Sequence, residues 1–266
     1  MRAPRCGRRV ADAPVADLAE ADSRKALADP LRSASILVAE DNDVNQEVIR
    51  RQLTLLGFRH EIASTGADAL RRLSNGSYTL LITDIHMPVM DGYELTTKVR
   101  EREAATGSPR MPIIAITANA LKSEAERCIS VGMDDYLSKP VSSATLRAML
   151  ERWTSAGLTN AEGGSEEPAS AEDRSVVDAG VRAKFRDSLE QSLADIRKAV
   201  TQEKWYDAGF HAHRLKSAAL AVGAGELAKA CARVEVAGLA RSETGVREAL
   251  AAFEEAAERE RRDLRG

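Results

Sequence analysis

The run Thr79-Leu-Leu-Ile-Thr-Asp-Ile85 decides the fold, because it is short, rich in large aliphatic side chains and carries an acidic residue near its end. Such a nearly continuous apolar run is typical of a parallel strand that is buried on both faces. Comparable short runs lie on either side of it in the chain, at 36–39, 60–63, 113–117 and 136–138. We therefore predict five strands in one parallel sheet.

Stretches with helical spacing of apolar residues alternate with these runs. They lie at 44–56, 67–73, 93–103, 121–131 and 144–153. Strict alternation of strands and helices predicts a doubly wound α/β domain of the (βα)5 type, with helices on both faces of the sheet. We place this domain at residues 35–154.

The second half of the chain has a different pattern. Residues 155–175 are rich in Gly, Ser and Glu, which is typical of a solvated linker. Strand patterns then stop, and helical spacing continues to the end of the chain, over 177–201, 205–222, 225–240 and 244–263. We predict an all-α four-helix bundle over residues 176–266. Residues 1–34 are expected to be a flexible leader, in which 15–27 could form a short helix.

Composition excludes several classes of protein. The net charge of -3 over 266 residues shows no overall excess of basic residues of the kind that nucleic-acid-binding proteins carry. Cys6, Cys128 and Cys231 are odd in number and far apart, which fits a reducing compartment better than a disulfide framework or a close-spaced zinc site. No run of about 18 apolar residues and no signal peptide is present, so we expect a cytoplasmic chain without membrane insertion.

Polar residues follow or close four of the five predicted strands: Glu40 and Asp41, Asp84, Thr117, and Lys139. Ligands of open parallel sheets bind beyond the carboxyl ends of the strands, so these side chains should share one crevice. Three carboxylates there would repel one another unless a cation joined them, and oxygen ligands suit Mg²⁺. A lysine and a hydroxyl beside them suit a transferring phosphoryl group, with Asp84 as the nucleophile.

Four segments of this domain closely resemble the response-regulator receiver family. They are Val38-Ala-Glu-Asp-Asn42, Leu81-Ile-Thr-Asp-Ile-His-Met-Pro-Val-Met-Asp-Gly92, Ile116-Thr-Ala-Asn-Ala120 and Gly132-Met-Asp-Asp-Tyr-Leu-Ser-Lys-Pro140. The resemblance implies that Asp84 is the phospho-acceptor and Asp41 a direct ligand of Mg²⁺. Glu40 would bind the metal through water, and His86 would contribute only its backbone carbonyl.

The same resemblance assigns roles to residues at the later strands. Thr117 would be the hydroxyl that moves toward the acyl phosphate, and Lys139 the lysine that pairs with it. Tyr136 would be the aromatic switch, and Pro140 would follow a cis peptide bond. Asn42 is expected to cap or support the first helix.

In the second domain, one apolar stripe at helical spacing predicts the side that faces the bundle core: Ala208, Ala212, Leu215, Ala219 and Val222. His213 falls on the opposite side and is expected to face solvent, whereas His211 lies nearer the edge of the stripe. A histidine that hands on phosphate needs exposure and an unprotonated ring nitrogen, which favours His213. Lys216, three residues later, could offset the charge of the phosphate.

The segment Ala212-His-Arg-Leu-Lys-Ser217, with Gly223-Ala224 and Leu227-Ala-Lys-Ala-Cys-Ala-Arg-Val-Glu235 after it, resembles the histidine phosphotransfer family. The resemblance implies that His213 is a second phospho-acceptor and Lys216 its supporting cation. Ser217 departs from the family, which more often has glycine there, and we expect the serine to weaken docking of a partner without abolishing it.

A receiver followed by a phosphotransfer domain resembles the C-terminal part of hybrid sensor histidine kinases. The sequence has no glycine-rich ATP-binding motif, no second histidine-bearing dimerisation helix and no sensor, so the phosphate donor is expected to be another protein. We predict transfer from a sensor histidine kinase to Asp84, between Asp84 and His213, and onward to a response regulator. Two alternatives are a phosphorylation-controlled binding module or phosphate sink, and a hydrolase of the Asp-nucleophile type. The hydrolase is disfavoured because position 86 is not a second aspartate.

Overall fold

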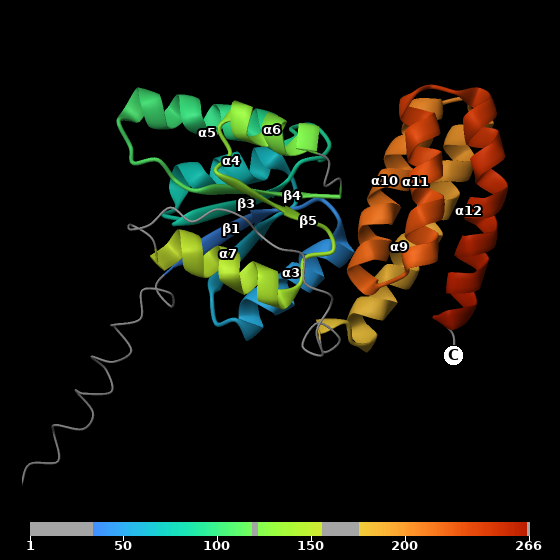
Figure 1. Ribbon diagram of the computed structural model, residues 1–266, viewed down its shortest axis with the longest axis horizontal. Coiled ribbons are helices and arrows are strands. Elements are labelled where there is room, and N and C mark those ends of the chain that lie inside the picture. Colours follow the sequence, from blue (N-terminus) through green and yellow to red (C-terminus); the bar gives the residue numbers. More distant parts are fainter. Residues whose placement is uncertain (1–33, 119–121, 156–175, 265–266) are drawn as a thin grey trace, which may run out of the picture.

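The computed structural model describes residues 34–118, 122–155 and 176–264 (Figure 1). The expected leader, with its possible short helix at 15–27, and the expected linker lie outside these ranges apart from Ala34 and Ser155. Within the described ranges, none of the helices combines the length and the apolar character that crossing a membrane requires.

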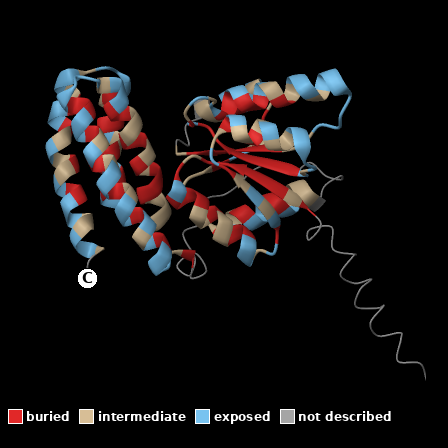
Figure 2. Ribbon diagram, turned by 180° about the vertical axis from the view of Figure 1, so that it is seen from behind, coloured by how far each residue is buried: buried red, intermediate tan, exposed pale blue. Residues whose placement is uncertain are grey.

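The first domain contains the predicted parallel sheet, with strand order β2-β1-β3-β4-β5. Its strands are β1 (Ser35–Ala39), β2 (Arg59–Ala63), β3 (Leu80–Asp84), β4 (Ile113–Thr117) and β5 (Asp135–Ser138). β1, β3 and β4 lie inside the sheet and are almost fully buried, as their continuous apolar sequences predict (Figure 2). The doubly wound α/β fold is confirmed.

Helices cover both faces of this sheet (Figure 1). They are α3 (Asp43–Leu55), α4 (Gly66–Asn75), α5 (Gly92–Thr106), α6 (Lys122–Val131) and α7 (Ser143–Ser155). One apolar core joins α3 and α7 to the sheet, and a second core joins α4, α5 and α6 to its other face. The side chain of Asn42 accepts hydrogen bonds from the backbone N–H groups of Val44 and Asn45, so the predicted N-cap of α3 is confirmed.

The second domain is the predicted four-helix bundle. It consists of α9 (Ala179–Thr201), α10 (Trp205–Val222), α11 (Gly225–Leu239) and α12 (Glu243–Asp263). Its core combines two phenylalanines, Phe185 and Phe253, with many alanines and leucines. On α10, Ala208, Ala212, Leu215 and Ala219 are fully buried, so the predicted stripe does face the core.

The contact between α10 and α11 depends on two glycines. A Cβ atom at Gly238 would lie 2.5 Å from the Cα atom of Gly209 and 2.6 Å from the carbonyl oxygen of Trp205. Both neighbours are backbone atoms, so a side chain at position 238 would force the two helices apart. This close approach holds α10, and therefore His213, at a fixed distance from α11.

Replacing Gly238 by alanine is expected to lower the free energy of unfolding by about 2 kcal/mol, since overpacking a tight core contact typically costs 1 to 3 kcal/mol. Gly225→Ala is the matched control on the same helix, because a Cβ atom there meets nothing within 4 Å. Urea denaturation followed by circular dichroism measures both. Equal stabilities of the two variants would contradict the packing described here.

Candidate functional site

The acidic residues of the first domain meet at the carboxyl ends of β1 and β3. The two strands are parallel neighbours in which Ala39 pairs with Thr83, so Glu40 and Asp84 lie side by side. Both carboxylates are buried. Glu40, Asp41 and Asp84 each offer a carboxylate oxygen, and these oxygens lie within 4.8 Å of one another. The structure therefore brings together the three acidic residues that the sequence predicted.

Lys139 joins two of these carboxylates from the loop after β5. Its Nζ atom donates to Asp84 Oδ2 at 2.7 Å and to Glu40 Oε2 at 2.9 Å. The peptide bond that follows, Lys139–Pro140, is cis, as the resemblance implied. Burial raises the pKa of Glu40 to about 7 even though Lys139 opposes this shift. Burial acts in the same direction on Asp84, but there the ammonium of Lys139 prevails and lowers the pKa below its usual value.

The three carboxylates fit a divalent cation such as Mg²⁺, which prefers oxygen ligands. Both oxygens of Glu40 already accept hydrogen bonds, from Lys139 and from Asn45. Asp41 Oδ2 lies 2.9 Å from Arg214 Nε of α10, so in the docked state this oxygen forms an ion pair. The direct role expected for Asp41 and the water-mediated role expected for Glu40 stay predictions.

The remaining predicted residues of the first domain lie on β4, on β5 and directly after β3. Thr117 ends β4 next to β3 and is buried. The backbone N–H of His86 lies 3.4 Å from Asp84 Oδ1. Tyr136 lies on the edge strand β5 and is 40% exposed, so its ring is open to solvent.

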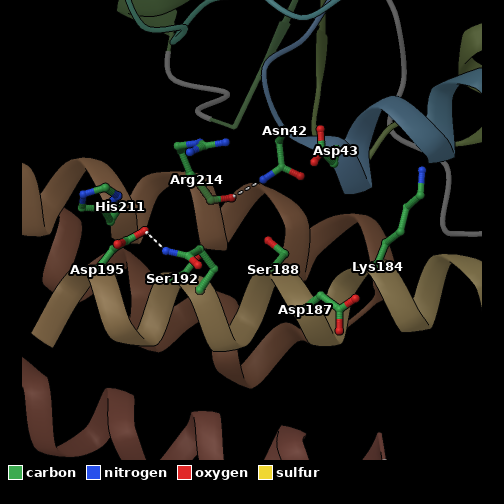
Figure 3. Close-up of a pocket in the computed structure, with 10 residues that line it drawn as sticks. Asn42, Asp43, Lys184, Asp187, Ser188, Ser192, Asp195, His211 and Arg214 are labelled. Carbon is green, nitrogen blue, oxygen red and sulfur yellow. Dashed lines mark hydrogen bonds between the residues drawn. The ribbon is translucent and has the colours of Figure 1, made fainter.

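His213 is not exposed, and the expectation that it faces solvent is wrong. The residue is only 8% accessible, and its ring lies against that of His86, with 4.6 Å between the ring centroids. The physical reason is that the sheet end of the first domain docks onto α10 and covers the histidine. His211, the alternative on the same helix, instead lines a cleft together with Asp195 of α9 (Figure 3).

Glu235 of α11 holds the ring of His213, and the sequence patterns did not identify this role. Its Oε1 atom lies 2.7 Å from His213 Nδ1, and its Oε2 atom lies 2.6 Å from Lys216 Nζ. Burial would raise the pKa of Glu235, but the contacts with His213 and Lys216 outweigh it and lower the pKa. An ionised carboxylate can only accept, so in the neutral imidazole the proton is on Nδ1 and the lone pair is on Nε2. Lys216 thus pairs with a carboxylate, which the sequence did not predict.

Two further residues of α10 contact the receiver site, Arg214 through a carboxylate of the acidic cluster and Ser217 through neighbouring donors. Arg214 Nε lies 2.9 Å from Asp41 Oδ2, and the backbone carbonyl of Arg214 accepts from Asn42. The Ser217 hydroxyl lies within hydrogen-bond distance of Lys139 Nζ and Asn45 Nδ2. Arg214 and Ser217 lie one turn apart on the helix, next to His213, so they fix α10 over the cluster.

Contacts of α3 with α9 and α10 extend the interface between the domains. Val44 is fully buried within the core of the helical bundle. Two ion pairs flank it, Arg51 with Asp178 at 2.6 Å and Lys184 with Glu47 at 3.0 Å. A polar cleft of about 360 Å³ lies beside these contacts, and Arg214, Asn42 and Lys184 line it (Figure 3).

The Glu47 ion pairs predict a pH dependence of stability. Hydrogen bonds from Arg51 and Lys184 lower the pKa of Glu47 to about 2, from about 4.5 when unpaired. A lowered pKa gives stability that is fully present above pH 4.5 and is lost as the pH falls toward 2. We expect Glu47→Gln to be less stable than wild type at pH 6 and the difference to shrink as the pH falls from 4.5 toward 2. Urea denaturation across this range measures it, and a constant difference would contradict the assignment.

Comparisons with known proteins agree with this architecture. A family model described as "Response regulator receiver domain" matches residues 36–151, and a second, described as "Hpt domain", matches residues 180–263.

Relatives of the first domain include hybrid signal transduction histidine kinase L of Dictyostelium discoideum, 37% identical over 121 residues, and sensor protein EvgS of Escherichia coli, 42% identical over 118 residues. Each match covers 44% of this chain but only 7% and 9% of the relatives' own lengths.

Among solved structures, the receiver domain of a sensor histidine kinase from Pseudomonas aeruginosa, with a magnesium ion in its active site cleft, is 41% identical, with a TM-score of 0.43. The match covers 46% of this chain and 98% of that one. The order of the two matched families follows the order of the two domains described above. The chain is therefore a fusion of a response regulator receiver domain and an Hpt domain, the two kinds of domain found in two-component phosphorelay systems.

Proposed function

We propose that this chain relays phosphate between proteins in a step that depends on Mg²⁺. A partner sensor histidine kinase phosphorylates Asp84, the phosphoryl group moves between Asp84 and His213, and a separate response regulator receives it. The proposed domain limits are residues 35–154 for the receiver and 176–266 for the phosphotransfer domain. The proposed location is the cytoplasm, which agrees with the two buried free thiols of Cys128 and Cys231.

One observation carries the proposal: His213 is buried against the acidic cluster that contains Asp84. A carboxylate beside a lysine and an imidazole are two phosphoryl acceptors, and here the imidazole lies against the ring of His86, two residues after Asp84. Since His213 is protected from bulk water, the transfer would compete well against hydrolysis.

In the transfer, one bond to phosphorus forms and another breaks. The lone pair of His213 Nε2 attacks phosphorus, the P–N bond forms, the P–O bond to Asp84 breaks, and the Asp84 carboxylate is regained. The proton on Nδ1 stays in its hydrogen bond to Glu235, which stabilises the positive charge that develops on the ring. Lys139 contacts Oδ2 of Asp84 and would stabilise the charge of the carboxylate that is regained. Reversal of the same step returns the group to Asp84.

Glu40, Asp41 and Asp84 would hold the metal ion, together with the backbone carbonyl of His86. When bound, Mg²⁺ would neutralise charge on the equatorial phosphoryl oxygens. Thr117 would donate its hydroxyl to one of these oxygens, and Tyr136 would respond to phosphorylation by changing its rotamer. Arg214 and Lys216 add two cations near the path of the phosphoryl group.

The alternative, a phosphorylation-controlled binding module or phosphate sink, is favoured by the burial of both acceptors in the docked state. Neither a kinase nor a regulator can reach them until the two domains separate. In this alternative, phosphorylation of Asp84 would change docking, and His213 would only store phosphate.

The test compares wild type, Asp84→Asn and His213→Gln after incubation with candidate autophosphorylated kinases, with and without a metal chelator. Hydroxylamine removes an aspartyl phosphate and acid removes a phosphohistidine. The relay predicts no label in Asp84→Asn, hydroxylamine-sensitive label alone in His213→Gln, and no label with chelator. If His213→Gln still passed phosphate to a regulator, the alternative would gain and the relay would fail.

A further inference from the structure

Ser217 of α10 is buried where this helix meets the receiver site. It is only 2% accessible, and its hydroxyl oxygen lies 2.8 Å from Lys139 Nζ and 3.0 Å from Asn45 Nδ2. A hydroxyl oxygen has two acceptor lone pairs, and two receiver donors use them here. The sequence led us to expect that serine at this position weakens docking, whereas the contacts show it bonded to both donors.

The lysine partner makes this contact more than a surface hydrogen bond. An ammonium group has three N–H donors, and those of Lys139 are directed to Glu40, Asp84 and Ser217. Two of the three acceptors belong to the receiver, and the third arrives only when α10 docks. Ser217 therefore completes the coordination of the ammonium that contacts the phospho-acceptor Asp84.

Asn45 completes the arrangement from α3. Its amide group donates to Glu40 Oε1 and to Ser217 Oγ, both at 3.0 Å. Without the hydroxyl, one N–H of Lys139 and one N–H of Asn45 would lose their acceptor inside a buried interface, which is unfavourable for both groups.

We propose that Ser217 is a positioning residue for the transfer between Asp84 and His213: its hydroxyl docks α10 onto the Lys139 ammonium and the Asn45 amide of the same chain. Ser217 lies one turn after His213, so this contact sets the approach of the imidazole to the phosphorylated carboxylate. The inference rests on the proposed function and adds the group that fixes the geometry of its internal step.

The full chain is phosphorylated with acetyl phosphate and Mg²⁺, and phosphohistidine is measured over time as the label that survives alkali, which removes the aspartyl phosphate. Ser217→Ala is expected to form phosphohistidine about tenfold more slowly, as is typical when a buried donor loses its partner. Phosphorylation of Asp84 is followed separately in a His213→Gln background and folding by urea denaturation, so that the effect on the transfer is read apart from effects on the first step and on stability. Ser192→Ala on α9, which also lines the cleft, is the control and should match wild type.

A second variant separates positioning from a general loss of packing. Asn45→Ala should also slow the transfer. The double variant, Asn45→Ala with Ser217→Ala, should transfer only slightly more slowly than the slower of the two single variants, because the two residues share one contact. Equal rates in Ser217→Ala and wild type, or fully multiplicative effects of the two substitutions, would overturn the inference while leaving the relay intact. Absence of phosphohistidine in wild type would instead overturn the relay and the inference together.

Discussion

Replacing Lys139 by methionine is expected to reduce phosphorylation of Asp84 by at least about 100-fold and to destabilise the receiver. The Nζ atom of Lys139 contacts Glu40 and Asp84, and all three side chains are buried. Removing one partner from a buried ion pair leaves an uncompensated charge and typically costs 3 to 5 kcal/mol. The carboxylates would respond by taking up protons, and a protonated Asp84 is a poor nucleophile.

The variant is measured by urea denaturation at pH 7 and by labelling with a phosphorylated kinase. Lys98→Met is the control, because Lys98 forms only a solvent-exposed ion pair with Glu94 on α5. In an Asp84→Asn background the same Lys139 substitution should destabilise the receiver less, since one of the charges it balances is already gone. A stability loss that is equal in both backgrounds would show that Lys139 does not pair with Asp84.

Replacing Glu235 by glutamine is expected to slow transfer from Asp84 to His213 by about 10- to 100-fold, by analogy with carboxylates that orient metal-binding histidines. The carboxylate accepts from His213 Nδ1 and pairs with Lys216. Glutamine has nearly the same shape but no charge. The correct tautomer of His213 would then be less favoured, and the charge on the ring would be less stabilised during the transfer.

Phosphohistidine formation from prephosphorylated Asp84 measures this effect. Glu226→Gln is the matched control, because Glu226 lies on the same helix and forms an exposed ion pair with Lys229. The Glu235 variant should label Asp84 at the wild-type rate, since Glu235 belongs to the other domain. An unchanged rate of transfer to His213 would exclude Glu235 from the site.

Local sequence patterns were sufficient to predict both folds and the acidic cluster. Continuous aliphatic runs identified β1, β3 and β4, and a polar residue after each of them lay at the same edge of the sheet. The apolar stripe of α10 also faced the core as predicted. These features repeat with the periods of strands and helices, so they can be read without knowing which segments meet.

Contacts between distant segments could not be read in this way. Glu235 is on a different helix from His213, and neither spacing nor composition connects the two. The burial of His213 depends on docking of the receiver, which a pattern on one helix cannot reveal. Arg214 and Asn45 lie in or next to the sequence motifs of the two domains. This position in the sequence was the only feature that could have predicted their role in the site.

The central claim is that phosphate passes between Asp84 and His213 within one chain. The most direct test is the rate of phosphohistidine formation from prephosphorylated wild type over a hundredfold range of protein concentration. Transfer within the chain predicts a rate constant that does not change with concentration, and only slow, concentration-dependent labelling in a mixture of Asp84→Asn and His213→Gln chains. A wild-type rate that rises in proportion to concentration, with equal efficiency in the mixture, would contradict the claim.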